Sequence, residues 1–555
     1  MSGSETGTKT EGGKPGEEAE APAGELLYCG GTSWDNLGRR SVPASGNLLS
    51  PTRLRSLMGV DIRFVASGCA SCHCVALDVE GRCYTWGRNE KGQLGHGDTL
   101  QRNLPTIVSE LSKYRVFRAG AGRNHTVVVT EDGKSFAFGG NKHGQLGTGS
   151  TRNELERAPV PCMTSQVTNA VCGADFTVWL SSVEGSSILT AGLPQYGQLG
   201  HGTENQYNAK DSSIKLVYEA QSRPRAIAAF SGKTVVKVAC GTNHTVAVDS
   251  SGFVYTWGFG GYGRLGHREQ KDEWVPRLVE VFQKQNILPP TAIVSAGSVN
   301  SACTGGGGQL YMWGKLKNTG DDWMYPKPVI DLSGWNIRCM NSGNMHHVIG
   351  ADESCISWGV AHCGELGYGP LGQKSSANPK KVDILEGMRI TSVACGTGLS
   401  LIVVDRANIG DRLEQLEVYD GVAPAEEMGD AEKDIATAIK STPKGRATDS
   451  SAKSKKKKKS SSESDDEYGA SEDGEDANGG TGDINPKRGG KSSGRGRGRN
   501  AKNFSTVESS GCGKGHSKSD RNSSGRGRGR PKAEEKTPGR GRGRARGGKK
   551  AKYST

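Results

Sequence analysis

Three glycines in the stretch "WGFGGYGRLGH", Gly258, Gly260 and Gly263, have the spacing G-x-G-x-x-G. That spacing can place backbone N–H groups against the pyrophosphate of a dinucleotide, provided that a strand precedes it and a helix follows at once. Similar stretches elsewhere have "GRNEKG", "GGNKHG", "GLPQYG" and "GVAHCG" at this point, so only the outer glycines recur. Turn glycines that need a positive φ explain this pattern. We therefore expect a turn here and no bound cofactor.

Four cysteines, Cys69, Cys72, Cys74 and Cys83, include a C-x-x-C-x-C spacing that could suit zinc. The segment alternates like a β-strand, which would place Cys72 and Cys74 on one face and His73 on the other. No second pair of ligands follows at the spacing of a zinc finger. We expect these cysteines to be small buried residues and expect no metal.

Histidines recur at one position of a second motif, as His125 in "GRNHTVVV" and His244 in "GTNHTVAV". His73 and either His346 or His347 lie near the same position of related stretches. An active site is usually unique, so a recurrent histidine indicates a structural role, with hydrogen bonds expected to neighbouring backbone carbonyls. The sequence shows no nucleophilic triad, H-E-x-x-H or Walker loop. We expect no catalytic residues.

The elements that position these residues are copies of one unit. Stretches such as "YTWGRNEKGQLGHGD" and "YTWGFGGYGRLGH" occur seven times, 45 to 66 residues apart. Most are preceded by an alternating run of β-branched residues that ends in a turn, as in a β-hairpin. Repeated antiparallel units that cannot bury a face alone predict an all-β ring of seven blades. The glycines that mark the copies are Gly30, Gly87, Gly139, Gly192, Gly258, Gly314 and Gly359.

The two ends of the repeat region complement each other. The last alternating run, Ile390–Asp405, has no W-G half after it, and the first W-G-like copy, Leu27–Gly38, has no alternating run before it. We therefore expect the N-terminal strands to pair with the last C-terminal strands and close a seven-bladed β-propeller, which removes exposed sheet edges.

Composition divides the chain into a propeller (25–405), a short helix or linker (406–420) and two tails, 1–24 and 421–555. In 406–420 we expect one apolar stripe of Leu413, Leu416 and Val418. Both tails are polar and too poor in apolar residues to fold alone, so we expect disorder. The N-terminal tail does not resemble a signal peptide, and no run of 18 apolar residues predicts a membrane span.

Charge is concentrated at the C-terminal end. Residues 444–555 contain 30 Lys and Arg against 14 Asp and Glu, a net charge of +16, whereas the whole chain carries +13 and residues 1–443 therefore −3. A basic run predicts nuclear import, and an acidic, serine-rich block (460–476) suits an acid-directed kinase. The residues of the basic run are Lys455, Lys456, Lys457, Lys458 and Lys459.

Three R-G-R-G-R blocks in the tail predict nucleic-acid binding. The middle block continues as "RGRPK", which looks like an AT-hook for the narrow minor groove of A·T-rich DNA. An RNA-binding tail and a merely solvated arm stay open as alternatives. The residues concerned are Arg495, Arg497, Arg499, Arg526, Arg528, Arg530, Lys532, Arg540, Arg542 and Arg544.

The repeats, with stretches such as "TSWDNLGRR", "MYPKPVIDLSGW" and "GELGYG", resemble the regulator-of-chromosome-condensation repeat family, most nearly a plant-type form of its telophase-disc branch. The resemblance implies a seven-bladed propeller that regulates small GTPases without covalent chemistry, as does the founding exchange factor for Ran, which also binds nucleosomes. It implies a nuclear, chromatin-associated monomer acting in cell division, possible also at the nucleolus or on mitotic chromosomes. The alternative is an RNA-bound scaffold without a GTPase partner. The clustered tryptophans of the family's ultraviolet-B photoreceptor branch are absent from the "GRNHT" and "GTNHT" positions.

Two segments are candidates for contact with a partner protein. The insert 203–233 is a candidate loop, and the charged stretch after the fourth G-x-L-G turn is a candidate rim or a plain solvated loop. The rim residues are Arg268, Lys271, Asp272, Glu273 and Trp274.

Overall fold

The computed structural model describes residues 23–39, 46–202, 205–210, 213–317, 321–407 and 409–422. The predicted N-terminal tail up to residue 22, the basic run, the acidic block and the Arg-Gly blocks lie outside these residues. The described chain is all-β: it contains strands and short 3-10 turns but no α-helix. No helix in these ranges has the length and hydropathy needed to cross a bilayer.

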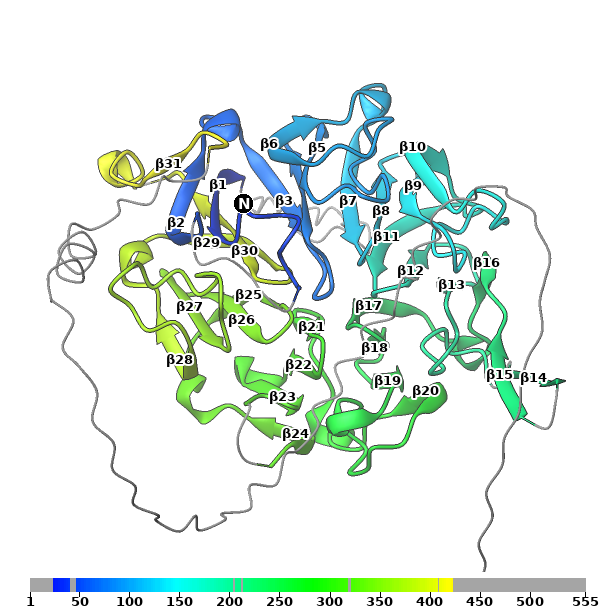
Figure 1. Cartoon of the computed structure of the whole chain (residues 1–555). Helices are drawn as coiled ribbons and strands as arrows, with labels where there is room; N and C mark the ends of the chain where they lie inside the picture. Colours follow the sequence, from blue (N-terminus) through cyan, green and yellow to red (C-terminus); the bar gives the residue numbers. More distant parts are fainter. Residues whose placement is uncertain are drawn as a thin grey trace, which may run out of the picture. The chain divides into compact units, whose positions relative to one another are not determined.

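The strands form seven blades arranged in a ring (Figure 1), which confirms the predicted fold. Each blade is an antiparallel sheet of four strands, with the first strand next to the axis of the ring and the fourth at its outside. The seven blades are β3 (Ile62–Ala66), β4 (His73–Asp78), β5 (Cys83–Gly87) and β6 (Arg102–Ile107); β7 (Val116–Ala121), β8 (His125–Thr130), β9 (Ser135–Gly140) and β10 (Leu155–Pro161); β11 (Val167–Cys172), β12 (Phe176–Ser181), β13 (Ile188–Gly192) and β16 (Gln221–Ala226); β17 (Val235–Cys240), β18 (His244–Asp249), β19 (Val254–Gly258) and β20 (Glu273–Leu278); β21 (Val294–Ala296), β22 (Asn300–Thr304), β23 (Leu310–Gly314) and β24 (Trp323–Pro328); β25 (Ile337–Ser342), β26 (His346–Ala351), β27 (Ser354–Gly359) and β28 (Ser376–Lys381); and β29 (Ile390–Cys395), β30 (Leu399–Asp405), β1 (Gly24–Gly30) and β2 (Leu48–Leu54).

Short 3-10 turns occur in the connections, many of them where one blade leads to the next. Their apolar residues, such as Leu111, Phe230 and Leu385, are buried against the blades. The turns are η1 (Arg55–Leu57), η2 (Ser109–Leu111), η3 (Ala228–Phe230), η4 (Gly261–Gly263), η5 (Lys284–Asn286), η6 (Gly306–Gly308), η7 (Ile330–Leu332), η8 (Asp383–Leu385) and η9 (Gly410–Arg412).

The ring is closed by the two ends of the repeat region. β1 pairs antiparallel with β30 from Gly24 opposite Asp405 to Gly30 opposite Leu399. The buried Glu25 carboxylate in β1 also accepts hydrogen bonds from Arg53 of β2 and from Arg406, the residue after β30. The prediction that N-terminal strands complete the seventh blade is confirmed.

In the first four blades, the recurring G-x-L-G turn packs on an aromatic residue of the next blade. A Cβ atom added at Gly147 would lie 2.7 Å from Trp179, and one at Gly266 would lie 3.0 Å from the Trp313 ring. Both glycines also have positive φ angles, so no other residue fits there without strain. The core consequently consists of apolar clusters between neighbouring blades.

A proline occupies the same register position in the fourth strand of every blade. These strands form the outer edges, where proline removes a free N–H group and so blocks pairing with another chain. The seven residues are Pro51, Pro105, Pro159, Pro224, Pro276, Pro326 and Pro379.

The segment after the ring runs back along the seventh blade. It contains η9 and the two-residue strand β31 (Val418–Tyr419), which pairs parallel with β2. Leu413 and Leu416 are buried, but Val418 is 36% exposed while Tyr419 is buried. The predicted stripe is therefore wrong at Val418, because strand alternation at the end of the segment turns Tyr419 inward instead.

Candidate functional site: the loop face around the fourth blade

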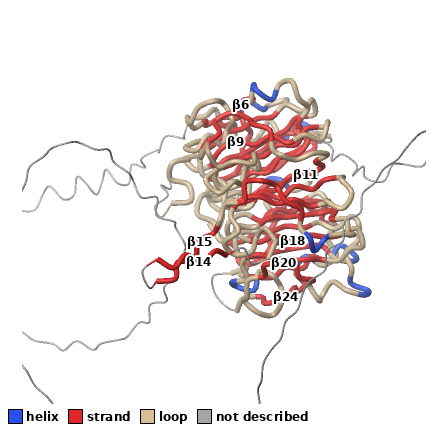
Figure 2. Tube along the Cα trace, turned by 90° about the vertical axis from the view of Figure 1, so that its right-hand side faces the viewer, coloured by secondary structure: helices blue, strands red, loops and turns tan. Residues whose placement is uncertain are grey.

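In each blade, the turn between the first two strands and the connection between the last two lie at the same end of the ring, because the four strands are antiparallel. We call this end the loop face. A two-stranded hairpin, β14 (Asn205–Lys210) and β15 (Ser213–Tyr218), is inserted in the third blade's connection and pairs with no other sheet. Seen from the side, it projects from this end (Figure 2). It lies within the predicted candidate insert.

The recurrent histidines connect neighbouring blades. His125 Nε2 lies 3.0 Å from Thr177 Oγ1 of the next blade, and that hydroxyl donates to the Gln145 carbonyl of the blade that contains His125 at 2.7 Å. Because the Thr177 hydroxyl donates its proton to this carbonyl, it can only accept from the histidine, so the His125 ring must carry its proton on Nε2. The Nε2 partner of His125 is a hydroxyl, so the predicted bond to a backbone carbonyl is wrong for this residue. The same relay joins His73 to Thr126, His244 to Ser301 and His346 to Ser400.

Burial keeps these imidazoles neutral. It lowers the pKa of His125 to about 4 and that of His73 to about 3. A neutral ring with one N–H group is the form that the relay requires, since the buried Nδ1 of His125 has no hydrogen-bond partner.

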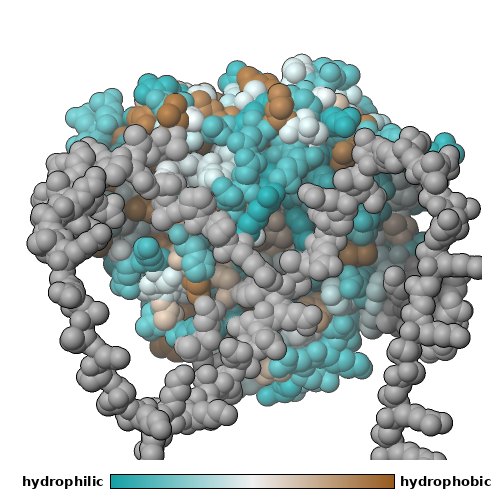
Figure 3. Space-filling model, viewed as in Figure 1, coloured by the Kyte–Doolittle hydropathy of each residue, from teal (hydrophilic) through white to brown (hydrophobic). Residues whose placement is uncertain are grey.

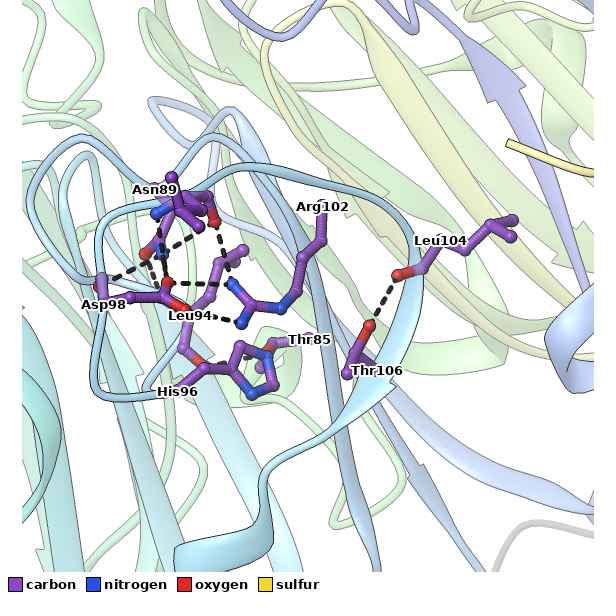
Figure 4. A network of polar contacts seen from close by, with 9 residues as sticks. Thr85, Asn89, Leu94, His96, Asp98, Arg102, Leu104 and Thr106 are labelled. Carbon is purple, nitrogen blue, oxygen red and sulfur yellow. Dashed lines mark hydrogen bonds and ion pairs between the residues drawn. The ribbon is translucent and has the colours of Figure 1, made fainter. Parts of the chain in front are cut away.

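A second polar network fixes the connection within a blade (Figure 4). Thr85 of β5 donates to the Leu94 carbonyl at 2.7 Å and lies 2.9 Å from His96 Nε2. Asn89 donates to the Leu100 carbonyl, and Asp98 pairs with Arg102 at 2.9 Å. These bonds hold the wide connection in one shape, so the loop face is a rigid surface.

The cysteines of the zinc-like spacing lie in different environments. Cys72 and Cys74 pack in one apolar cluster and Cys83 in the next. Cys69 lies 3.5 Å from Thr242 Oγ1 of the fourth blade, across the ring. Within the described ranges, no three His, Cys, Asp or Glu residues are grouped so that they could hold a metal ion.

The G-x-G-x-x-G stretch forms the end of β19 and the turn η4, and strand β20 follows it. Gly258 and Gly263 have φ angles of 104° and 71°, which confirms the prediction of turn glycines. Gly260 is required for a different reason, because an added Cβ would lie 1.9 Å from the Lys271 carbonyl oxygen.

This turn departs from the other copies at Arg264. In the first three blades a buried glutamine stands at this position, and its Oε1 accepts the N–H of the residue two earlier, as Gln93 does from Lys91 at 2.9 Å. Arginine cannot accept a hydrogen bond. Instead Tyr262 donates its N–H to Gln270 Oε1 at 3.1 Å, and Tyr262 has a φ of 61°.

The Arg264 side chain crosses to the next blade. It is 3% exposed, and it donates from Nε to the Gly261 carbonyl and from Nη1 to the Ser298 carbonyl at 2.6 Å. Its guanidinium lies 4.6 Å from the Phe259 ring centre and 5.5 Å from that of Tyr262. Burial lowers the Arg264 pKa to about 10.

The predicted rim residues come directly after this turn in the chain. Some of them are exposed, and others make contacts within the fourth blade. Arg268 and Lys271 are exposed, and the Arg268 guanidinium lies 4.4 Å from the Tyr325 ring centre. Asp272 accepts the Gly260 N–H at 2.8 Å, which fixes the turn. Glu273 is half-buried and pairs with Arg277 at 2.7 Å.

Trp274 supports the inserted hairpin. Its carbonyl accepts the Gly202 N–H at 2.9 Å, just before the hairpin begins. Gly197 packs against Trp274 so closely that an added Cβ would lie 2.6 Å from the Trp274 Cα. The connection that contains the hairpin is therefore anchored on the fourth blade by the same backbone contacts as the corresponding connections of other blades.

Where residues are coloured in Figure 3, the visible side is mainly hydrophilic with separate apolar spots. The prediction missed Arg264 and Lys315, whose ammonium lies 5.0 Å from the Tyr262 ring centre. The available signal was the change from Q-L-G in the first three blades to R-L-G in the fourth.

Comparison with known proteins decides the family. The regulator of chromosome condensation (RCC1) repeat matches residues 80–129, 132–180, 187–248, 251–303 and 352–403, and a second form of that repeat matches 62–93 and 235–264. The chain is also 41% identical to human Protein RCC2 over 405 residues, which cover 68% of this chain and 76% of RCC2. The chain belongs to the RCC1-repeat family. The predicted resemblance is thus confirmed at the level of the family.

Two further relatives of this RCC1-repeat protein are informative. The ultraviolet-B receptor UVR8 of Arabidopsis thaliana is 30% identical over 301 residues, covering 54% of this chain and 63% of UVR8. The structure of Prp20p from Saccharomyces cerevisiae, described with its binding properties to Gsp1p and histones, has a TM-score of 0.56 at 19% identity. It covers 71% of this chain and 94% of Prp20p, which supports the common fold.

Proposed function

We propose that this protein is a nuclear, chromatin-associated scaffold that regulates a small GTPase during cell division. The observation that carries the proposal is the loop face, where the third blade's connection contains a projecting hairpin and the fourth blade's turn departs from the other copies at Arg264. Prp20p, with the same fold, was described with its binding to Gsp1p and histones. A rigid face with one projecting element suits a protein partner whose own shape must be changed on binding.

Nucleotide exchange would need no covalent chemistry from this chain. An exchange factor acts by binding the nucleotide-free GTPase more tightly than the nucleotide-bound form, which shifts the equilibrium toward release. The described residues fit such a role, since their recurrent polar groups are used within and between blades.

The Arg-Gly blocks, outside the described residues, would hold the protein at chromatin. Their arginines and glycines suit the minor groove of A·T-rich DNA, and such binding should weaken steeply with salt. Preference for RNA over A·T-rich duplex at equal salt would instead support the alternative of an RNA-bound scaffold.

The test measures binding of the full chain to a panel of nucleotide-free small GTPases and the rate at which each releases a fluorescent GDP. We expect at least one GTPase to bind preferentially in the nucleotide-free form. Replacing 205–218 by a short Gly-Ser link should reduce that binding tenfold or more. The control is Leu371→Ser, a fully exposed residue in the sixth blade's connection. No preference for any nucleotide-free GTPase would contradict the proposal.

A further inference from the structure

Arg264 is a buried cation without a counter-ion. It forms no ion pair with a described residue, although buried charges in proteins are normally paired. The Asp272 and Asp322 carboxylates interact electrostatically with Arg264 but form no ion pair with it. The Asp272 carboxylate instead accepts a hydrogen bond from the Gly260 N–H. Burial raises the pKa of both aspartates. The nearby positive charge of Arg264 therefore does not outweigh the cost of burying these carboxylates.

One nitrogen of the guanidinium is available. Nε and Nη1 donate to carbonyls, whereas Nη2 donates to no described residue. Nη2 is also not among the fully buried polar atoms that lack a partner, so it reaches solvent. The group is thus held rigidly by two bonds and presents a third nitrogen outward.

The surroundings favour a flat, singly charged anion. The rings of Phe259 and Tyr262 lie against the guanidinium, and the ammonium of the half-buried Lys315 lies 5.0 Å from the Tyr262 ring centre. Lys315 likewise forms no ion pair with any residue in the described ranges. Two cations beside aromatic rings can accommodate a carboxylate, whereas a phosphate with its further oxygens would need more donors.

The altered turn also carries backbone strain. Tyr262 and Arg268, neither of them glycine, have φ angles of 61° and 67° within seven residues. Such conformations are strained for residues with a Cβ atom, and they concentrate at functional sites. Among the seven copies, the strained turn is also the one in which arginine replaces glutamine.

We propose that Arg264, with Lys315, Phe259 and Tyr262, forms a binding site for an Asp or Glu side chain of a partner protein that docks on the loop face. The site rests on the proposed function in that it assigns the chemistry of a protein contact on this face. It places a buried, stacked arginine at the centre of the contact, which is the type of residue that dominates protein interfaces.

The experiment uses residues 1–422, because every strand of the ring lies within 24–419 and the Arg-Gly blocks, which would also bind acidic peptides, are then removed. The probe is a fluorescein-labelled peptide, Gly-Glu-Glu-Gly-Glu-Glu-Gly, compared with its Gln counterpart by fluorescence anisotropy. We expect the Glu peptide to bind at least tenfold more tightly. Arg264→Gln should reduce its binding to the level of the Gln peptide, and Lys315→Gln should reduce it partly.

Arg264→Gln restores the residue found in the first three blades, so the fold should be kept and the thermal midpoint should stay the same or rise. Arg39→Gln is the control, since Arg39 is exposed and paired with Glu90, and it should bind like wild type. Unchanged peptide binding by Arg264→Gln would overturn the proposal, as would stronger displacement by inorganic phosphate than by acetate. Peptide binding that depends on Arg264 in a chain that binds no GTPase would overturn the proposed function alone.

Discussion

Glu25 is the residue on which closure of the ring should depend most. It is 2% exposed, and its carboxylate lies 2.5 Å from Arg53 Nε and 3.2 Å from Arg406 Nε. Removal of one member of a buried ion pair typically costs about 3–5 kcal/mol, because the remaining charge stays buried without a partner. Arg406 is partly exposed and keeps its pairing with Asp61. We therefore expect Glu25→Gln to cost about 3 kcal/mol, the lower end of that range.

The measurement is urea unfolding followed by the fluorescence of the buried tryptophans. With a slope of about 3 kcal/mol/M, the midpoint of Glu25→Gln should fall by ~1 M. The matched control is Glu90→Gln, which removes an exposed ion pair with Arg39 and should cost at most about 1 kcal/mol. Equal shifts for the two variants would refute the argument that the buried pairs hold the first strand in the seventh blade.

Four other outcomes are expected. Acid should destabilise the ring, because the pKa of His125 is about 4 in the folded protein and 6.5 ordinarily. The contribution of neutral His125 to the free energy of unfolding is complete above pH 6.5 and is lost as pH falls toward 4, by about 2 kcal/mol at pH 5. His125→Gln should therefore flatten the pH profile of the thermal midpoint. Thr177→Val leaves both relay partners unpaired and should cost about 1–3 kcal/mol in the same urea assay. A chain that ends at residue 405 should melt at a lower temperature than one that ends at 422, because two buried leucines and a strand are lost. Arg528→Ala with Arg530→Ala should weaken binding to A·T-rich DNA more than to G·C-rich DNA in anisotropy titrations, and equal losses would indicate a general basic tail.

The architecture was predictable because it repeats. Each copy carries the same turn glycines and the same alternating run, so seven weak patterns support one another, and the unmatched halves at the two ends predict closure. The role of Cys72 and Cys74 followed from strand alternation in the same way. In contrast, the partners of His125 were predicted wrongly, because Thr177 lies in the following repeat and only the stacking of blades brings the two side chains together.

Single residues outside the repeat pattern were harder to interpret. Val418 was wrongly predicted to join the apolar stripe, because the segment after the ring ends in two residues of strand, too few to show a period in the sequence. The outer-strand prolines recur in every copy, but their meaning depends on knowing which strand lies at the edge. The rim prediction selected charged residues, of which Asp272 and Glu273 make contacts within the turn and its strand.

In a repeat protein, the residues that recur in every copy serve the structure, whereas residues that differ from the repeat pattern can serve a function. The histidine relays and the turn glycines recur because every blade must be held to the next, and a residue needed in several blades at once is not free to serve one partner. The fifth blade has lost its G-x-L-G turn, and the RCC1 repeat correspondingly finds no match between residues 304 and 351. Arg264 lies in the turn just before this irregular blade and reaches its Ser298 carbonyl. A binding residue can replace the structural glutamine there without loss of the repeated packing, because Gly266 of the same turn still packs on Trp313 of the next blade.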